Sequence, residues 1–304
     1  MPTPLPRIAI LLATHDGERY LDEQLDTALG QHGVAVTVFA SDDSSSDGTF
    51  ALLQRRAAND SRVIVLPQVR AGSAHANFRR LLAEVDPAAF DAVGLADQDD
   101  RWHEGRLARQ IALLDAGFDA VSSDVVMFDE RGSTTVIRKS QPQVRFDYLL
   151  ESAGPGSTFL LGREAASLVH RVMRDDERTA RAGAHDWLVY AIVRGAGLRW
   201  RIDPVPTVDY RQHDANALGA NRGVAAAAER GSRIVNGWLR RHAVVVAEIV
   251  LDLQQRPDPE LREILTVMCG PRWQQWRLAR RAAQLRRKRS EARFLSVLMR
   301  LGLW

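Results

Sequence analysis

The sequence predicts an α/β fold built around a mostly parallel sheet. Over residues 7–96, short apolar runs alternate with segments whose apolar residues recur at helical spacing. Alternation of this kind favours right-handed βαβ units. Acidic or hydroxyl-rich loops follow three of the apolar runs, which places all three loops at one edge of such a sheet. The chain has 304 residues, 45% of them hydrophobic, enough for one large or two small globular domains.

Each expected element rests on its own local pattern. Apolar, β-rich runs predict strands at 7–14, 34–40, 63–66 and 92–96, and helical spacing predicts helices at 20–29, 50–58 and 74–85. The middle of the chain is less regular, with strands expected at 120–128, 198–202 and 207–210, a hairpin arm at 131–139, and helices at 163–173 and 185–194. From residue 224 the composition is helical, with helices expected at 224–240, 242–255, 259–269, 273–289 and 294–303. We therefore expect a first domain over residues 1–220 and a helical C-terminal region over residues 221–304.

Three loops, which we call the edge loops, follow the first, second and fourth predicted strands. They cover residues 14–18, 42–47 and 97–100. Open α/β sheets bind ligands in the crevice outside the carboxyl ends of their strands. The sequence contains neither G-x-G-x-x-G nor G-x-x-x-x-G-K-[ST], so neither a dinucleotide fingerprint nor a P-loop explains this edge.

The third edge loop carries three carboxylates within four positions, at Asp97, Asp99 and Asp100. Asp97 and Asp99 are two residues apart, so in an extended segment they point to the same side. Like charges brought together favour a cation between them, and Mg²⁺ and Mn²⁺ prefer oxygen ligands, often carboxylates plus substrate phosphates. One interpretation is a metal–diphosphate site. The alternative is a solvated acidic turn that caps the next helix, the role we expect for Asp100.

Composition bears on the cellular compartment of the protein and on whether it spans a membrane. The single cysteine, Cys269, excludes an intrachain disulfide and fits a reducing compartment. No stretch of about 18 uninterrupted apolar residues occurs, so no membrane-spanning helix is expected. The apolar run near the N-terminus lacks a positive flank and a cleavage-like segment, and is expected to be a strand instead of a signal peptide.

The net charge of +3 is unevenly distributed. Residues 271–304 contain ten Arg or Lys and one acid, which gives this tail +9 and leaves −6 on residues 1–270. Tryptophan, phenylalanine and leucine interleave with these arginines, a pattern typical of a helix at a membrane surface. The alternative is a solvated helical face that packs its apolar stripe on the rest of the protein. No nucleic-acid recognition motif accompanies the charges, so nucleic acid is not an expected partner.

Five segments together resemble the inverting family 2 glycosyltransferases of the GT-A fold, in particular a bacterial rhamnosyltransferase-like subgroup. The segments are residues 13–21 (ATHDGERYL), 41–49 (SDDSSSDGT), 96–102 (ADQDDRW), 185–187 (HDW) and 210–213 (YRQH). Their order and spacing cover roughly residues 7–216. The chain departs from the family at His15-Asp16, where Tyr-Asn is frequent, and at Arg70, where Asn is common.

The resemblance implies a role for each matching residue. Thr14 and Glu18 would line the nucleotide pocket, Asp42 would accept a hydrogen bond from the pyrimidine ring, and Asp43 would support that loop. Asp99 would be the main metal ligand, with Asp97 near the ribose or the metal. Asp186 would be the catalytic base on the acceptor side, although an acid at a helix start is also simply favourable. Arg211 and His213 would meet the diphosphate or the metal, and a loop histidine that only orients backbone is the alternative for His213.

The implied function is a metal-dependent, inverting transfer of a sugar, with L-rhamnose suggested by the subgroup. A dTDP- or UDP-sugar would be the donor, a glycan or lipid-linked molecule the acceptor, and Mn²⁺ or Mg²⁺ the cofactor, in bacterial cell-surface polysaccharide synthesis. The expected location is cytoplasmic, peripheral at the inner face of the cell membrane, with the tail on anionic lipid. Two other classes remain open: a catalytically silent sugar-nucleotide-binding protein, and a metal-dependent phosphohydrolase or nucleotidyltransferase.

Overall fold

A computed structural model describes residues 4–129, 132–212 and 237–304. The chain divides into two compact units. The sheet unit comprises Met1–Ser140, Gly154–Ala180 and Leu198–Ala215, and the helical unit comprises Gln141–Ala153, Arg181–Gly197 and Asn216–Trp304. The predicted domain boundary at residue 220 lies outside the described residues and stays a prediction.

The larger sheet of the sheet unit has the strand order β10-β6-β9-β4-β1-β2-β3. Its strands are β1 (Arg7–Thr14), β2 (Ala35–Asp42), β3 (Val63–Val65), β4 (Ala92–Ala96), β6 (Ala120–Ser123), β9 (Leu160–Gly162) and β10 (Trp200–Asp203). All neighbours are parallel except β9, which runs antiparallel to β4 and β6. The mostly parallel sheet predicted from the sequence is thus confirmed.

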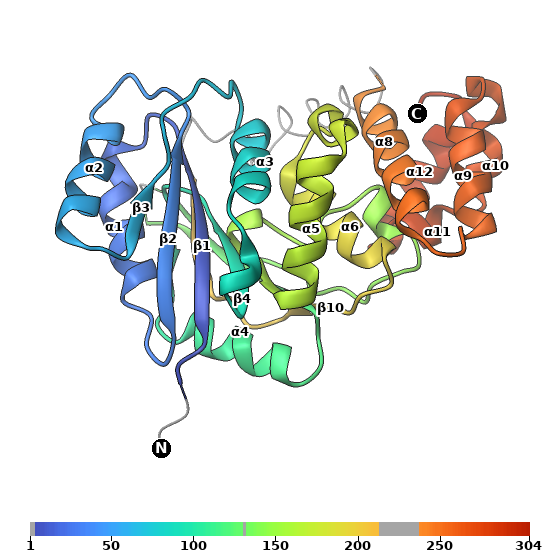
Figure 1. The fold of residues 1–304 in the computed structure, drawn as a ribbon. Helices are drawn as coiled ribbons and strands as arrows, with labels where there is room; N and C mark the ends of the chain where they lie inside the picture. The colour runs from blue at the N-terminus through green and yellow to red at the C-terminus, as the bar shows by residue number, and fades with distance from the viewer. Residues whose placement is uncertain (1–3, 130–131, 213–236) are drawn as a thin grey trace. The chain divides into compact units, whose positions relative to one another are not determined.

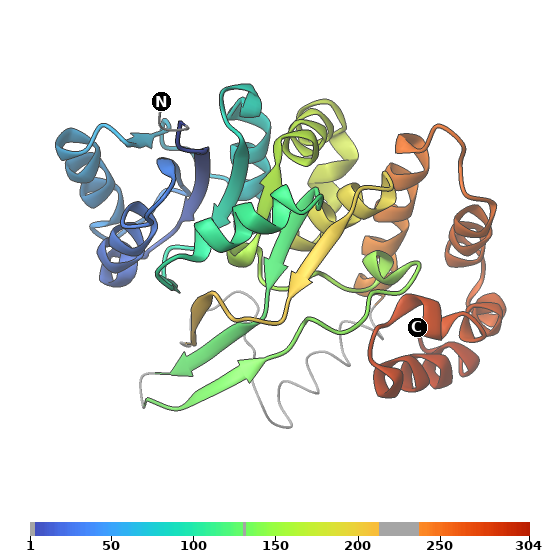
Figure 2. The ribbon, with the colours of Figure 1, turned by 90° about the horizontal axis from the view of Figure 1, so that it is seen from below.

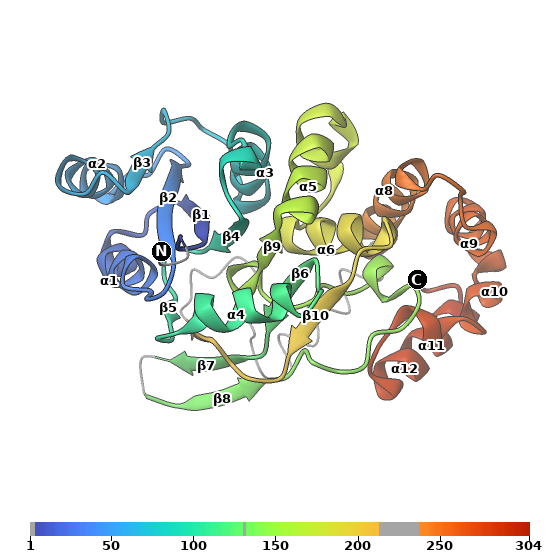
Figure 3. The same ribbon diagram turned by 60° about the horizontal axis from the view of Figure 1, so that its bottom comes forward.

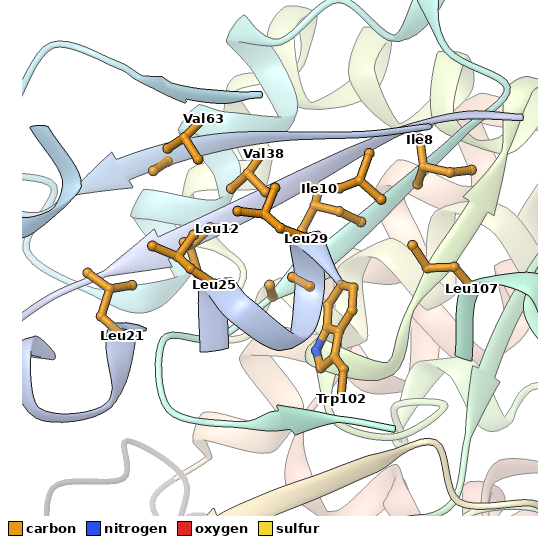
Figure 4. Close-up of a cluster of buried hydrophobic side chains, with 14 of the residues drawn as sticks. Ile8, Ile10, Leu12, Leu21, Leu25, Leu29, Val38, Val63, Trp102 and Leu107 are labelled. Atoms are coloured by element: carbon orange, nitrogen blue, oxygen red, sulfur yellow. The ribbon is translucent and has the colours of Figure 1, made fainter. Parts of the chain in front are cut away.

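Helices cover both faces of this sheet. In Figure 1, α1 (Glu18–Leu29) and α2 (Thr49–Asn59) lie on one side of β1 and β2, and α3 (Ala74–Glu84) and α5 (Arg163–Asp175) lie on the other. Side chains alternate along a strand, so Ile8, Ile10 and Leu12 of β1 share the face toward α1, where they form a buried cluster with Leu21 and Leu25 (Figure 4). This buried cluster holds β1 and β2 against the helices, so the loops that follow the two strands start from a fixed position.

A smaller sheet has the order β5-β11-β7-β8. It consists of β5 (Arg101–Trp102), β11 (Val208–Gln212), β7 (Val125–Asp129) and β8 (Thr134–Ile137) (Figure 3). The antiparallel pairing of β7 with β8 confirms the predicted hairpin arm. Because β5 begins directly after Asp100 and pairs antiparallel with β11, this sheet ties the third edge loop to a segment more than 100 residues later in the chain.

The helical unit contains α6 (His185–Gly195), α8 (Trp238–Leu253), α9 (Pro259–Cys269), α10 (Trp276–Ala279), α11 (Ala282–Leu285) and α12 (Arg289–Arg300). Helices α8 to α12 are drawn in orange to red in Figure 2. Helix α4 (Arg106–Asp115) belongs to the sheet unit. None of the helices in the described ranges is long and apolar enough to cross a membrane.

The single helix predicted for residues 273–289 is wrong. A 3-10 turn at Arg272–Gln275 precedes α10 and α11, and the chain is extended at Arg286. Tertiary contacts override helix propensity here, because Arg286 donates to the carbonyl of Leu150 at 2.6 Å and buried Arg287 donates to the carbonyl of Ser152 at 2.6 Å. These two hydrogen bonds hold Arg286 and Arg287 against residues 150–152, so the helix that the sequence pattern predicts is interrupted there.

Candidate functional site at the carboxyl edge of the sheet

The first two edge loops lie side by side because β1 and β2 pair in parallel register, with Thr14 opposite Asp42. The amide of Asp43 continues the ladder and donates to the carbonyl of Thr14 at 2.9 Å. Beyond this point the chain adopts the left-handed region at two non-glycine residues, Asp16 (φ 46°) and Ser44 (φ 51°). Such conformations are uncommon and cluster at functional sites, where neighbouring contacts hold them.

The carboxylate of Asp42 organises the second edge loop. Its Oδ1 accepts from the hydroxyls of Thr14 at 2.9 Å and Ser45 at 2.5 Å, and its Oδ2 accepts from the amide of Ser45 at 2.9 Å and from Gln68 Nε2 at 2.7 Å. Asp42 is fully buried. A carboxylate has about four lone-pair sites, so these four donors use its acceptor capacity. The hydrogen bond that Asp42 is expected to accept from a pyrimidine ring stays a prediction.

Asp43 holds the turn that follows β3. Its Oδ1 accepts from the amides of Ala71 at 2.5 Å and Gly72 at 2.9 Å. Gly72 has a φ of +83°, which a glycine adopts without strain. Asp43 thus joins the second edge loop to the chain leading into α3. Its expected role at the nucleotide site stays a prediction.

Glu18 also binds backbone, at Gly48, directly after the second edge loop. Its Oε2 accepts from the amide of Gly48 at 2.9 Å, and its own amide donates to Asp47 Oδ2 at 3.1 Å. A Cβ on Gly48 would lie 2.2 Å from Glu18 Oε1, so only glycine fits beside this carboxylate in its present position. Reciprocal bonds of this kind fix the first two edge loops to each other.

Gln98, the middle residue between Asp97 and Asp99, joins the third edge loop to the first. Its Oε1 accepts from the amide of His15 at 2.7 Å and its Nε2 donates to the carbonyl of His15 at 2.8 Å. Sequence reasoning assigned no role to this residue, although its place inside an Asp-x-Asp pattern is a signal that could have drawn attention to it.

Asp97 and Asp99 lie directly after β4 and are both half-buried. In the described part of the chain, no group of three or more His, Cys, Asp or Glu side chains is arranged to hold a metal. Two carboxylates nevertheless fit a Mg²⁺ or Mn²⁺ ion, because these ions take the rest of their oxygen ligands from water and substrate phosphates. The negative charge of this loop affects its third acid. Burial raises the pKa of Asp100 to about 7, and the charge of the neighbouring Asp99 carboxylate is the second cause of this increase.

The expectation that Asp100 caps a helix is wrong. The residue is buried, the strand β5 follows it, and α4 begins only at Arg106 after Gly105. Asp100 Oδ1 accepts instead from the backbone amide of Arg211 at 3.2 Å. A long-range contact with β11 therefore takes the place of the local cap that the sequence suggested.

Arg211 is a largely buried residue of β11 that supports the third edge loop through bonds to its backbone and side chains. Its Nε donates to the carbonyl of Asp99 at 2.8 Å, and its guanidinium forms an ion pair with Glu23 of α1. The same guanidinium lies over the rings of Tyr20 and Phe128, with distances of 4.3 and 4.6 Å to the ring centroids. Glu23, a mid-helix acid without a local signal, was missed by sequence reasoning. The expected contact of Arg211 with a diphosphate stays a prediction.

Asp186 and His213 complete the predicted set. Asp186 lies in the helical unit, in the first turn of α6, where its Oδ1 accepts from the amide of Trp187 at 2.7 Å. The indole of Trp187 donates to the carbonyl of Tyr148 at 2.7 Å, which fixes the start of this helix. His213 lies outside the described residues. The roles of both residues stay predictions.

Comparison with known proteins identifies the family. Residues 9–168 match the model of glycosyl transferase family 2. The chain is 32% identical over 245 residues to the dTDP-rhamnosyl transferase RfbG of Shigella flexneri, covering 79% of this chain and 85% of that protein. It is 28% identical over 133 residues to the putative glycosyltransferase EpsE of Bacillus subtilis (strain 168), covering 42% of this chain and 46% of that protein.

Solved structures show the same fold at lower identity. Residues 1–349 of TarS from S. aureus, in complex with UDP-GlcNAc, match with a TM-score of 0.54 and 13% identity, over 98% of this chain and 93% of that one. The mannosyltransferase PcManGT from Pyrobaculum calidifontis, in complex with GDP-Man and Mn²⁺, matches with a TM-score of 0.54 and 19% identity, over 100% and 82%. With its GT-A sheet, its C-terminal helices and its edge loops, the chain belongs to glycosyl transferase family 2 and is a glycosyltransferase.

Proposed function

We propose that this enzyme transfers a sugar, L-rhamnose in the first instance, from a dTDP-sugar to a glycan or lipid-linked acceptor with inversion at the anomeric carbon. A UDP-sugar is the alternative donor. The observation that carries the proposal is the pair of half-buried carboxylates, Asp97 and Asp99, directly after β4, on the sheet edge that also carries Asp42. The relationship to RfbG supports the choice of dTDP-rhamnose as the donor to test first.

Each part of the edge has a task in this proposal. Asp97 and Asp99 would hold Mn²⁺ or Mg²⁺, which when bound supplies positive charge against the diphosphate leaving group. Thr14, Glu18, Asp42 and Asp43 keep the first two loops in place, so that the nucleotide meets a preorganised wall. Preorganisation is supported by the many bonds these residues make to backbone amides and to one another.

Asp186 would act as the base. A carboxylate on the acceptor side takes the proton of the attacking hydroxyl as the new glycosidic bond forms and the bond to the diphosphate breaks. One direct displacement inverts the anomeric centre. Asp186 lies in the first turn of α6, where the helix dipole makes an acidic side chain favourable.

The test is Asp186→Asn, assayed with dTDP-L-rhamnose and UDP-sugars. We expect nucleoside diphosphate binding near the wild-type value, measured by calorimetry with Mn²⁺, and loss of transfer by about two to four orders of magnitude. Transfer at the wild-type rate would contradict the assignment. Rapid, metal-dependent nucleotide release that ignores every acceptor would identify a hydrolase, and tight binding without turnover by the wild type would identify a silent binding protein.

We also propose that the enzyme works in the cytoplasm, as a peripheral protein at the inner face of the cell membrane, in the synthesis of cell-surface polysaccharide. A lipid-linked acceptor would be presented there. The excess positive charge of residues 271–304 supports this location.

A further inference from the structure

Large exposed apolar side chains concentrate near the C-terminal end of the chain. Eleven are found among the described residues, and six of these fall between residues 273 and 303. The six are Trp273, Trp276, Phe294, Val297, Leu301 and Leu303, with exposed fractions between 41% and 71%. Single exposed apolar residues are ordinary, but a contiguous group on one face marks an interaction site.

Helix α12 has two apolar sides. Ala292, Leu295 and Met299 are buried and hold the helix to the rest of the helical unit. Phe294, Val297 and Leu301 follow the spacing i, i+3 and i+7, so they share one face, and each is more than half exposed. A solvated surface helix needs only the first of these two sides, so the second requires another explanation.

A row of arginines flanks the exposed stripe. Arg289, Arg293 and Arg300 follow the spacing i, i+4 and i+11, so they lie on one flank of α12, next to Val297, and all three are exposed. No ion pair joins them to any residue within the described ranges. We call the three arginines together with Phe294, Val297 and Leu301 the α12 face.

Four other arginines of the tail form ion pairs within the helical unit. Arg277 pairs with Glu263 at 3.2 Å, Arg281 with Glu260 and Glu263 at 2.7 Å each, and Arg286 with Glu291 at 2.8 Å. The side chain of Arg287 is buried against Asp147 and Glu151. Four of the five arginines within residues 277–287 are therefore paired with acids of the helical unit. The fifth, Arg280, is exposed and lies over the ring of Trp276. Helix α12 adds three exposed arginines that have no ion pair within the described ranges.

We propose that the α12 face docks on an anionic lipid surface, with α12 lying in the plane of the headgroups. Phe294, Val297 and Leu301 would enter the acyl boundary while the flanking arginines contact lipid phosphates, the arrangement of interfacial amphipathic helices. The 3-10 turn that carries Trp273 packs against α12, and an exposed tryptophan there suits the headgroup region. This inference rests on the proposed action at a membrane and names the surface that would serve it.

The test is co-sedimentation of the full-length protein with vesicles of phosphatidylcholine alone or with phosphatidylglycerol. We expect the wild type to bind the anionic vesicles, Phe294→Ser/Leu301→Ser to lose about tenfold or more in affinity, and Arg293→Gln/Arg300→Gln to lose the preference for anionic lipid. Val136→Ser/Val205→Ser removes two exposed apolar residues of the sheet unit and is the matched control, expected to bind as the wild type does. All replaced side chains are exposed, and a thermal melt checks that each variant folds.

Three outcomes would overturn the inference. The wild type binds neither vesicle; the α12 variants bind as well as the wild type; or the wild type is a dimer by sedimentation equilibrium and Phe294→Ser/Leu301→Ser makes it monomeric, which would assign the face to a second copy of the chain. Donor turnover in solution is measured in parallel. Retained turnover with no lipid binding defeats the α12 inference and the proposed membrane location but leaves the proposed sugar transfer in place, whereas lipid binding without sugar transfer by the wild type defeats the proposed transfer and leaves the α12 inference in place.

Discussion

The carboxylate of Asp42 offers the sharpest test of how the nucleotide edge is built. In the structure, two hydroxyls and two N–H groups converge on it, and it is completely buried. Asp42→Asn keeps the size and shape of the side chain but removes the charge and replaces one acceptor oxygen by a donor. The change therefore tests the polar network and leaves the packing unchanged.

The expected cost follows from the four partners. The hydroxyls of Thr14 and Ser45 can rotate to accept from the new amide group, so the Asn side chain will place its nitrogen at the position of Oδ1. All four bonds then become neutral. Hydrogen bonds to charged groups contribute roughly 1.5–3 kcal/mol and neutral ones roughly 0.5–1.5 kcal/mol, so about 1 kcal/mol is lost per bond. The relief of not burying a charge offsets part of this, and we expect a net loss of about 2–3 kcal/mol in the free energy of unfolding.

Urea denaturation of Asp42→Asn measures this loss directly, from the shift in midpoint at constant slope. The control is Asp22→Asn on α1, whose side chain is 60% exposed and pairs with Arg56 at 3.3 Å. We expect the control to change stability by less than about 0.5 kcal/mol. If Asp42→Asn unfolds at the wild-type midpoint, the carboxylate does not organise the loop and the reasoning fails.

Three further expectations concern the metal, the support of the third edge loop and a helix cap. Asp99→Ala should weaken Mn²⁺-dependent binding of a nucleoside diphosphate in calorimetry, and equal binding would show that the metal assignment is wrong. Arg211→Lys removes the fork that reaches both Asp99 and Glu23 and should cost about 1–3 kcal/mol in a thermal melt and raise KM for the donor; an unchanged melting temperature would contradict the support role. Asp258 caps α9 through the amides of Glu260 and Leu261. Burial would raise the pKa of Asp258, but hydrogen bonds from Arg145 and from the Glu260 amide outweigh burial and lower it. The ionised Asp258 side chain therefore contributes to stability above about pH 4, and this contribution is lost as the pH falls through the lowered pKa. Asp258→Ala should therefore cost about 1 kcal/mol at pH 7 and progressively less as the pH falls through the lowered pKa; a pH-independent cost would refute the ionised cap.

Local sequence patterns determined the parallel core and the location of the candidate site. Strands β1, β2 and β4 are short apolar runs that end in polar loops, and the carboxyl ends of parallel strands share an edge by geometry. Thr14, Asp42, Asp97 and Asp99 could therefore be assigned to that edge from their positions after the apolar runs alone. The five matching segments supplied the family, because their order along the chain is more specific than any one of them.

Only the tertiary structure decided how the loops are held and which charges remain free. Asp100 appeared suited to a local helix cap, yet it accepts from Arg211, 111 residues away. Gln98 and Glu23 act through partners in other elements, which no local pattern reveals. The arginines of the tail look alike in the sequence, but acids of α9 and of residues 147–151 neutralise some of them and leave those of α12 exposed. The reason is physical: propensity and periodicity act over a few residues, whereas the pairing of buried polar groups is settled by contacts between distant segments.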